Sequence, residues 1–148
     1  MRARLERFLR EDLSTVLVCA AACGADLLAL EQARKLNIRF RVILPYTPAE
    51  FRRTSVEDRP GNWGRLFDEI VNQANEANDL VVLREAVGSP SAYRNTNKAI
   101  VSHATAVGAD SKIVALVWEG VARKRGDSTA GLANMAIAAG FERRDIAI

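Results

Sequence analysis

The apolar residues of this chain follow two spacings in turn, and this alternation predicts helices and strands that succeed one another. Apolar residues three and four positions apart predict helices over residues 1–12, 27–37, 63–71, 91–108 and 129–140. Short continuous apolar runs predict buried strands over residues 14–19, 38–45, 78–83, 112–118 and 145–148. Segment 46–62 shows neither spacing and is expected to be a long loop, with Asn62 as the N-cap of the helix that follows.

This order of elements predicts the α/β class: a Rossmann-like three-layer sandwich with a mainly parallel sheet of about five strands. A chain of 148 residues with 49% apolar residues fits a single domain, residues 1–148. In such sheets, ligands bind outside the carboxyl ends of the strands, where the strand order reverses. We therefore expect three loops to form the binding edge: residues 19–26, 45–62 and 119–129.

The charge and composition of the chain limit the classes of partner that we expect it to bind. The net charge is only +3, and the 21 basic residues are dispersed among 18 acidic ones, so we expect no nucleic-acid partner. The chain has no apolar run of roughly 18 residues, and its charged amino-terminal stretch has no apolar centre, which predicts a cytoplasmic protein without a membrane partner. Cys19 and Cys23 are then expected to be free thiols, because their spacing and the single His103 do not suit a metal site.

The stretch "CAAACGAD", residues 19–26, joins a predicted strand to a predicted helix through small side chains. Small residues allow a ligand to approach the backbone, and the free amides of a helix start attract anions. Small residues between a strand and a helix more often serve close packing, and the spacing alone leaves both interpretations open. The stretch has neither a three-glycine dinucleotide fingerprint nor a Walker A sequence.

The other two loops also contain groups that could bind an anion. Arg52, Arg53 and Arg59 lie close to the hydroxyls of Thr54 and Ser55, although arginines in an exposed loop are often simply solvated. Residues 126–129 read Gly-Asp-Ser-Thr directly before a helix, which fits an ordinary N-cap or an anion site. We find no motif that predicts catalysis. The sequence contains no nucleophile elbow, and its spacing identifies neither a catalytic histidine nor a pair of catalytic carboxylates.

Taken together, several motifs resemble the SLOG superfamily, which comprises Rossmann-like domains related to lonely-guy phosphoribohydrolases and to DNA-processing protein A. The resemblance covers most of the chain from Val16 onward. It rests on the turn at residues 24–26, the stretch "LPYTPAEFRRTSV", the strand end "WEG" at residues 118–120, and the late stretch "GDSTAGLANMAIAAG".

The resemblance implies a pocket for the phosphates or ribose of a nucleotide. It suggests that backbone groups of the first turn contact the ligand and that the carboxylate of the same turn lies near the ribose. Hydroxyl groups would lie over the ligand, and the turn before the last helix would form a second phosphate-binding site. The residues implied are Ala22, Cys23, Gly24, Asp26, Thr54, Ser55, Trp118, Gly120, Ser128 and Thr129. Two departures stand out: relatives begin with one more strand, which is either truncated here or supplied by another chain, and the late turn reads Asp-Ser-Thr in place of Gly-Gly-Thr.

We therefore expect a domain that binds a nucleotide or an ADP-ribose-like molecule, as a sensor or partner module without catalytic residues or cofactor of its own. One alternative is a nucleoside-monophosphate N-glycosidase, although the PGGxGTxxE motif of the lonely-guy enzymes is absent. Another is an oligomerisation module that has lost its pocket. Because a missing first strand would expose a sheet edge, we also expect a homodimer.

Overall fold

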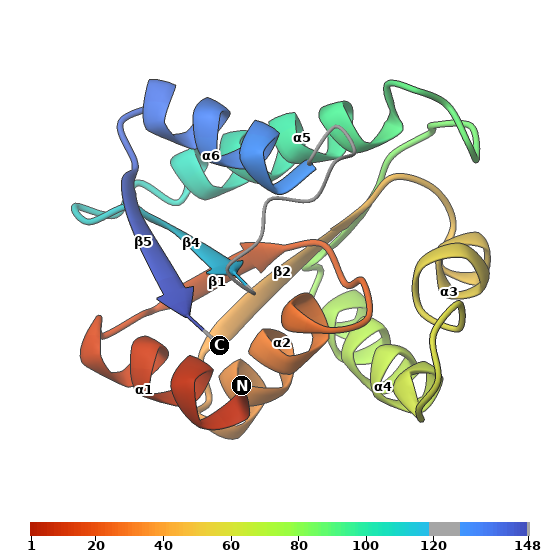
Figure 1. Cartoon of the computed structure of the whole chain (residues 1–148), viewed down its shortest axis with the longest axis horizontal. Coiled ribbons are helices and arrows are strands. Elements are labelled where there is room, and N and C mark those ends of the chain that lie inside the picture. Colours follow the sequence, from red (N-terminus) through yellow and green to blue (C-terminus); the bar gives the residue numbers. More distant parts are fainter. Residues whose placement is uncertain (119–127, 148) are drawn as a thin grey trace.

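The computed structural model describes residues 1–118 and 128–147, except for the side chains of Trp118 and Ser128. Helices and strands alternate through these residues as the apolar spacing predicts (Figure 1). The elements are α1 (Arg2–Glu11), β1 (Val16–Cys19), α2 (Ala25–Lys35), β2 (Arg39–Leu44), α3 (Pro48–Ser55), α4 (Trp63–Glu76), β3 (Leu80–Val82), α5 (Ala92–Ala106), β4 (Ile113–Trp118), α6 (Ser128–Ala138) and β5 (Glu142–Ala147).

The prediction of a long loop over residues 46–62 is wrong for the first half of this segment, which forms helix α3. The Thr47 side chain accepts a hydrogen bond from the amide of Glu50 at 3.3 Å, and Pro48 occupies the first helical position. Both features are standard helix-start signals. Asn62 precedes α4 as expected, but its side chain makes no capping hydrogen bond.

The strands form two parallel sheets instead of the single sheet of about five strands that the sequence predicted. One sheet has the order β1-β2-β3 and the other pairs β4 with β5. In register, Cys19 lies opposite Val42 and Leu44 opposite Val82, while Val117 lies opposite Ile146. The parallel pairing agrees with the prediction; the break between β1 and β4 does not.

Helices cover the strands on both sides, so the architecture has three layers (Figure 1). Helices α1, α2 and α4 lie on one side, where α2 contacts both α1 and α4. Helices α5 and α6 pack against each other on the other side, α5 over β1 and β2 and α6 over β4 and β5. No described helix combines the length and apolar character needed to cross a membrane.

The main core surrounds β2, whose residues Val42, Ile43 and Leu44 have no exposed surface. Phe51 of α3 stacks on Phe67 of α4 with ring centroids 5.9 Å apart, which closes this core at the carboxyl end of β2. Burying each such ring contributes roughly 1.5–3 kcal/mol. A smaller cluster, made by Val114, Leu116 and side chains of α6, lies around β4. The larger core therefore belongs to the three-stranded sheet.

Candidate functional site

A cavity of about 480 Å³ lies between β1 and β4, and we call it the β1–β4 cleft. Its volume falls within the range of small-molecule sites, roughly 300–1,000 Å³. The chain leaves β1 toward β2 and β3 on one side, whereas β4 and β5 lie on the other, so the strand order reverses at this cleft. Asp26 of α2 and Thr129 of α6 line it, each in the first turn of a helix that follows one of the bordering strands. The cleft thus occupies the position where open α/β sheets bind ligands.

The turn before α2 is closed by hydrogen bonds within the protein. The amide of Ala22 donates to Oδ2 of Asp26 at 3.2 Å, and the amide of Cys23 donates to the carbonyl of Ser55 at 3.0 Å. Two of the amides that the sequence assigned to a ligand are therefore already engaged. The next three amides, those of residues 24–26, have no hydrogen-bond partner among the described residues.

Gly24 gives the turn its shape. Its backbone has φ +100° and ψ −128°, which L-residues rarely adopt, and a Cβ added there would meet no atom within 4 Å. The glycine is therefore required by the backbone conformation and not by lack of space. This conformation directs the chain from β1 into α2 and places the three free amides at the carboxyl end of the cleft.

Among the described acids near this turn, Asp26 has the carboxyl pKa that departs most from its ordinary value. Burial raises the pKa of its carboxyl from 3.8 to about 6, against the opposing effect of the hydrogen bond from Ala22. Asp26 is half-buried, and it belongs to the lining of the cleft. At neutral pH it is mainly ionised, so it can accept hydrogen bonds from hydroxyl groups of a ligand.

The hydroxyl groups predicted at residues 54 and 55 lie beside this turn. The Tyr46 hydroxyl and Thr54 Oγ1 are 3.1 Å apart, and Thr54 Oγ1 is 3.4 Å from Ser55 Oγ. The Tyr93 hydroxyl, at the start of α5, lies close enough to the hydroxyls of Ser55 and Tyr46 to interact with them. We call these four residues the hydroxyl cluster. The bond between Cys23 and Ser55 joins it to the α2 turn, so Thr54 and Ser55 lie near that turn, next to the cleft but not in its lining.

Sequence reasoning missed Tyr46 and Tyr93. Tyr46 follows the predicted strand "RVIL" after one proline, which places it at the carboxyl edge and could have identified it. Nothing in the local sequence singles out Tyr93, because its contact depends on how α5 crosses the sheet.

Other predicted residues have different positions. Arg52 pairs with Asp68 of α4 at 3.0 Å and with Glu57, so its guanidinium has a structural role in the free protein. Glu119–Asp127, including Gly120, lie outside the described residues, as do the side chains of Trp118 and Ser128. Of the predicted late turn, the structure places only Thr129, which lines the cleft.

The two cysteines are free and are partly exposed. Burial, with a smaller contribution from Asp26, raises the pKa of Cys19 well above its ordinary value. Burial also raises the pKa of Cys23. The charge of Arg59 opposes this rise, and Asp58 adds to it. Both thiols are therefore protonated near neutral pH, which disfavours a nucleophilic or redox role. No group of three or more His, Cys, Asp and Glu side chains within residues 1–118 and 128–147 is arranged to hold a metal ion.

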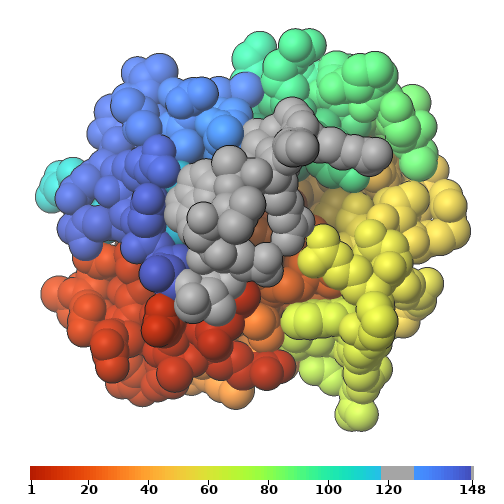
Figure 2. Space-filling view, in the orientation of Figure 1, coloured from red at the N-terminus to blue at the C-terminus, as the bar shows by residue number. Residues whose placement is uncertain are grey.

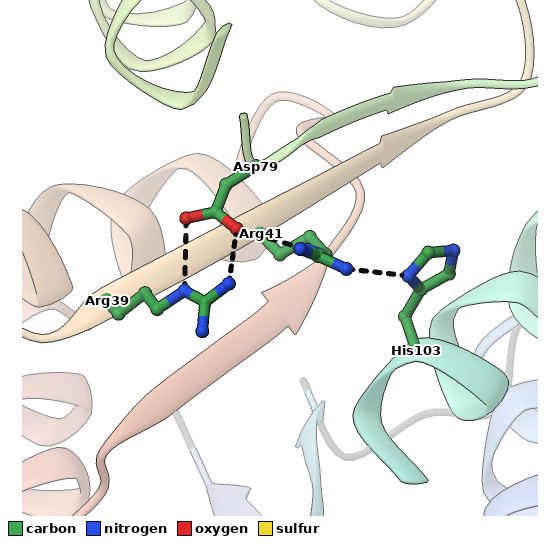
Figure 3. A network of polar contacts seen from close by, with 4 residues as sticks. All are labelled: Arg39, Arg41, Asp79 and His103. Carbon is green, nitrogen blue, oxygen red and sulfur yellow. Dashed lines mark hydrogen bonds and ion pairs between the residues drawn. The ribbon is translucent and has the colours of Figure 1, made fainter. Parts of the chain in front are cut away.

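A second charged group lies at the opposite end of the strands. Arg39 and Arg41 of β2 both bind the carboxylate of Asp79, at 2.8 and 3.1 Å, and Arg41 also lies 3.0 Å from Nδ1 of His103 (Figure 3). Arginine has no acceptor atom, so Nδ1 of His103 is the acceptor in this contact. This network joins β2, the start of β3 and α5. His103 belongs to it and does not line the cleft.

Fold and site together define a parallel α/β protein with a ligand-sized cleft at its topological switch point. Comparisons with protein-family models, with curated proteins and with solved structures find no match to this chain.

Proposed function

We propose that the protein binds a nucleotide or a nucleotide derivative, such as an ADP-ribose-like molecule, at the carboxyl end of the β1–β4 cleft. The supporting observation is the meeting of two helix starts at one switch point, with the half-buried carboxylate of Asp26, in the first turn of α2, in the lining of the cleft. Helix starts favour phosphate groups, and a carboxylate favours the hydroxyls of a ribose. Phosphate and ribose are the two parts of a nucleotide that this pair of features fits.

In this proposal, the phosphates bind at the first turn of α6 and at the free amides of residues 24–26. Asp26 accepts from the ribose, and the hydroxyl cluster borders the ligand on the side of α3. The proposed role is binding, as a sensor or partner domain without turnover.

The test is calorimetric titration of the purified protein at pH 7.5 with AMP, ADP and ADP-ribose. We expect binding of at least one of them, and we expect Asp26→Asn to weaken it by on the order of tenfold or more, because a hydrogen bond to a charged group is worth about 1.5–3 kcal/mol. Glu76→Gln is the matched control: it makes the same chemical change on an exposed residue at the end of α4 that does not line the cleft.

Absence of binding at millimolar concentrations of all three would refute the proposal. Equal affinity of Asp26→Asn and the parent protein would place the site elsewhere. Chromatography of the titrated mixtures adds a further readout, since release of free adenine from AMP would replace the binding role by the N-glycosidase alternative.

A further inference from the structure

A second cavity lies between the end of α3 and one side of α4, and we call it the α3–α4 cavity. Its volume of about 410 Å³ falls within the range of small-molecule sites. In the space-filling view, the surface of α4 adjoins that of α2, whose first turn belongs to the proposed ligand site (Figure 2). The described residues that line the cavity are charged residues, asparagines and glycines, and none has an apolar side chain. The cavity therefore suits a polar group of a ligand, in contrast to the largely apolar β1–β4 cleft.

The α3–α4 cavity and the α2 turn share one bordering segment of chain. Sγ of Cys23, in the turn, is 3.7 Å from Oδ1 of Asp58. The next residue, Arg59, lies close enough to Cys23 to act on its thiol electrostatically, and it also lines the cavity. The amide of Cys23 is bonded to the carbonyl of Ser55, at the end of α3. Arg59 therefore borders both the cavity and the turn that carries the free amides of residues 24–26.

One wall of the cavity is held in place by Arg52. Its guanidinium pairs with Asp68 at 3.0 Å and with Glu57. It also lies against Gly64, in the first turn of α4, where an added Cβ would be 2.5 Å from Nη2 of Arg52. The absence of a side chain at Gly64 permits this close approach. Both acids of this wall are therefore compensated by an arginine in the free protein.

The other ionic groups of the cavity leave one arginine uncompensated. Glu69 pairs with Arg65 at 3.4 Å and with Arg34 at 3.2 Å. Arg59 makes no ion pair with any residue that the structure describes. The start of α4 receives no capping hydrogen bond from the side chain of Asn62 and has no acid in its first turn, so its amides add to the positive potential. An anionic group of a ligand is therefore favoured beside Arg59.

The rest of the cavity suits a neutral group with several hydroxyls. Carboxylates accept hydrogen bonds from hydroxyl groups, and the side-chain amide of Asn72, which lines the cavity, can both donate and accept. Because the acids of the cavity are already paired with arginines, a second strongly charged group would find no unpaired partner among them. A sugar offers hydroxyl groups without a charge and fits this environment.

We propose that the α3–α4 cavity is a sugar subsite, and that the ligand of this protein is a nucleoside diphosphate whose second phosphate carries a further sugar. The inference rests on the proposed function, since the nucleoside half binds at the β1–β4 cleft. The diphosphate extends from the helix starts toward Arg59, and the hydroxyls of the second sugar meet Asn72 and the carboxylates of α4. A mononucleotide would leave both Arg59 and the cavity unused.

The experiment is calorimetric titration of the full chain at pH 7.5 with AMP, ADP and ADP-ribose. Two variants test the subsite, and each has a matched control: Arg59→Gln is compared with Arg7→Gln, and Asn72→Ala with Gln73→Ala. All four positions are exposed, so the substitutions leave the core unchanged. Neither Arg7 nor Gln73 lines the cleft or the α3–α4 cavity.

We expect the parent protein to bind ADP-ribose on the order of tenfold or more tightly than ADP, because the second sugar adds hydrogen bonds. Asn72→Ala should lower the affinity for ADP-ribose about fivefold and leave the affinities for AMP and ADP unchanged. Arg59→Gln should lower the affinities for ADP and ADP-ribose on the order of tenfold, because a charge-assisted hydrogen bond to the second phosphate is lost. Its affinity for AMP should equal that of the parent, and both controls should behave as the parent does.

Equal affinities of the parent for ADP and ADP-ribose would overturn the proposal, and so would variants that behave like their controls. In either case the binding of AMP would still support the proposed function, so the two failures are distinguishable. Absence of binding by all three compounds would refute both.

Discussion

At the scale of single residues, Asp26 and Gly24 are both held in states that cost stability. Burial raises the pKa of the Asp26 carboxyl, and Gly24 has a backbone conformation that other residues rarely adopt. Unfavourable states of this kind persist where a function needs them, which agrees with the proposed binding role of the turn.

The first prediction concerns pH. The pKa of Asp26 is about 6 in the folded protein and 3.8 ordinarily. Between these two pH values the folded state keeps a proton that the unfolded state has released, so the free energy of unfolding falls as the pH rises from about 4 to about 6 and then levels off. Asp26→Asn removes this fall and should be more stable than the parent at pH 7 by about 1–3 kcal/mol.

Urea denaturation at several pH values between 4 and 8 measures this difference, with Glu76→Gln as the control that keeps the parent's pH dependence. Parallel stability curves for Asp26→Asn and the parent would contradict the prediction. A variant that is more stable but binds AMP or ADP-ribose less tightly would show that the carboxylate serves the ligand and not the fold.

The second prediction compares two glycines. Gly24→Ala should lower the free energy of unfolding by about 1–3 kcal/mol, because its φ of +100° is unfavourable for alanine even though the space is open. Gly131→Ala, inside α6, should raise it by roughly 0.5–1 kcal/mol, since an added Cβ meets only Asn97 at 3.7 Å. Thermal denaturation of both variants checks the opposite signs, and destabilisation by both would refute the explanation.

At the scale of elements, β2 organises the fold. It pairs with strands on both sides, contains three residues with no exposed surface, and presents Arg39 and Arg41 to Asp79. The hydrogen bond from Arg39, assisted by Arg41, holds the pKa of Asp79 below its ordinary value, against the effect of burial. One carboxylate therefore connects the strand to the start of β3 and, through Arg41 and His103, to α5.

The third prediction tests this connection. Asp79→Asn should lower the free energy of unfolding at pH 7 by about 1.5–3 kcal/mol, because charge-assisted hydrogen bonds to two arginines are lost. Since the folded pKa is depressed, the contribution is present above the ordinary carboxyl pKa of about 4 and disappears as the pH falls through the lower, folded value.

Denaturant titrations at pH 7 and at acidic pH measure the loss. Glu69→Gln is the control, as its ion pairs with Arg34 and Arg65 are exposed and should contribute less than about 1 kcal/mol. Equal effects of the two substitutions would show that the Asp79 network adds nothing beyond ordinary surface charge.

Element positions could largely be predicted from the sequence, because apolar spacing reflects which side of each element is buried. The α3 helix was missed although "TPAE" contains both a capping pair and a proline at the first position. The division into two sheets could not be predicted, since strands that border a cleft and strands inside a sheet have the same apolar sequence. Of the candidate site, the turn at residues 22–26 and Thr129 follow from sequence, whereas Tyr93 depends on three-dimensional packing.

At the scale of the whole molecule, the two sheets differ in the size of the apolar cluster that packs against them. The three-stranded sheet has helices α2 and α4 packed over it and a large apolar cluster, whereas β4 and β5 rest on the smaller cluster shared with α6. The half that contains β5 should therefore open more readily than the half that contains β2.

The fourth prediction follows from this difference. Amide protons of Val42, Ile43 and Leu44 should exchange only through global unfolding, while those of β5 should exchange faster by on the order of tenfold or more. Native-state hydrogen exchange at increasing urea concentration measures both. Exchange of β5 with the same free energy and the same urea dependence as β2 would show that the two sheets unfold as one unit.

The hydrogen bond between Arg4 and Ala147 also determines how this protein could be joined to others. It brings both described ends of the chain to one edge of the molecule, the edge at which the strands end and α2 and α6 begin (Figure 1). A domain fused to either end would therefore be tethered on the same side of the fold as the proposed ligand site. A fused domain would therefore lie a short distance from the proposed ligand site, whichever end it was attached to.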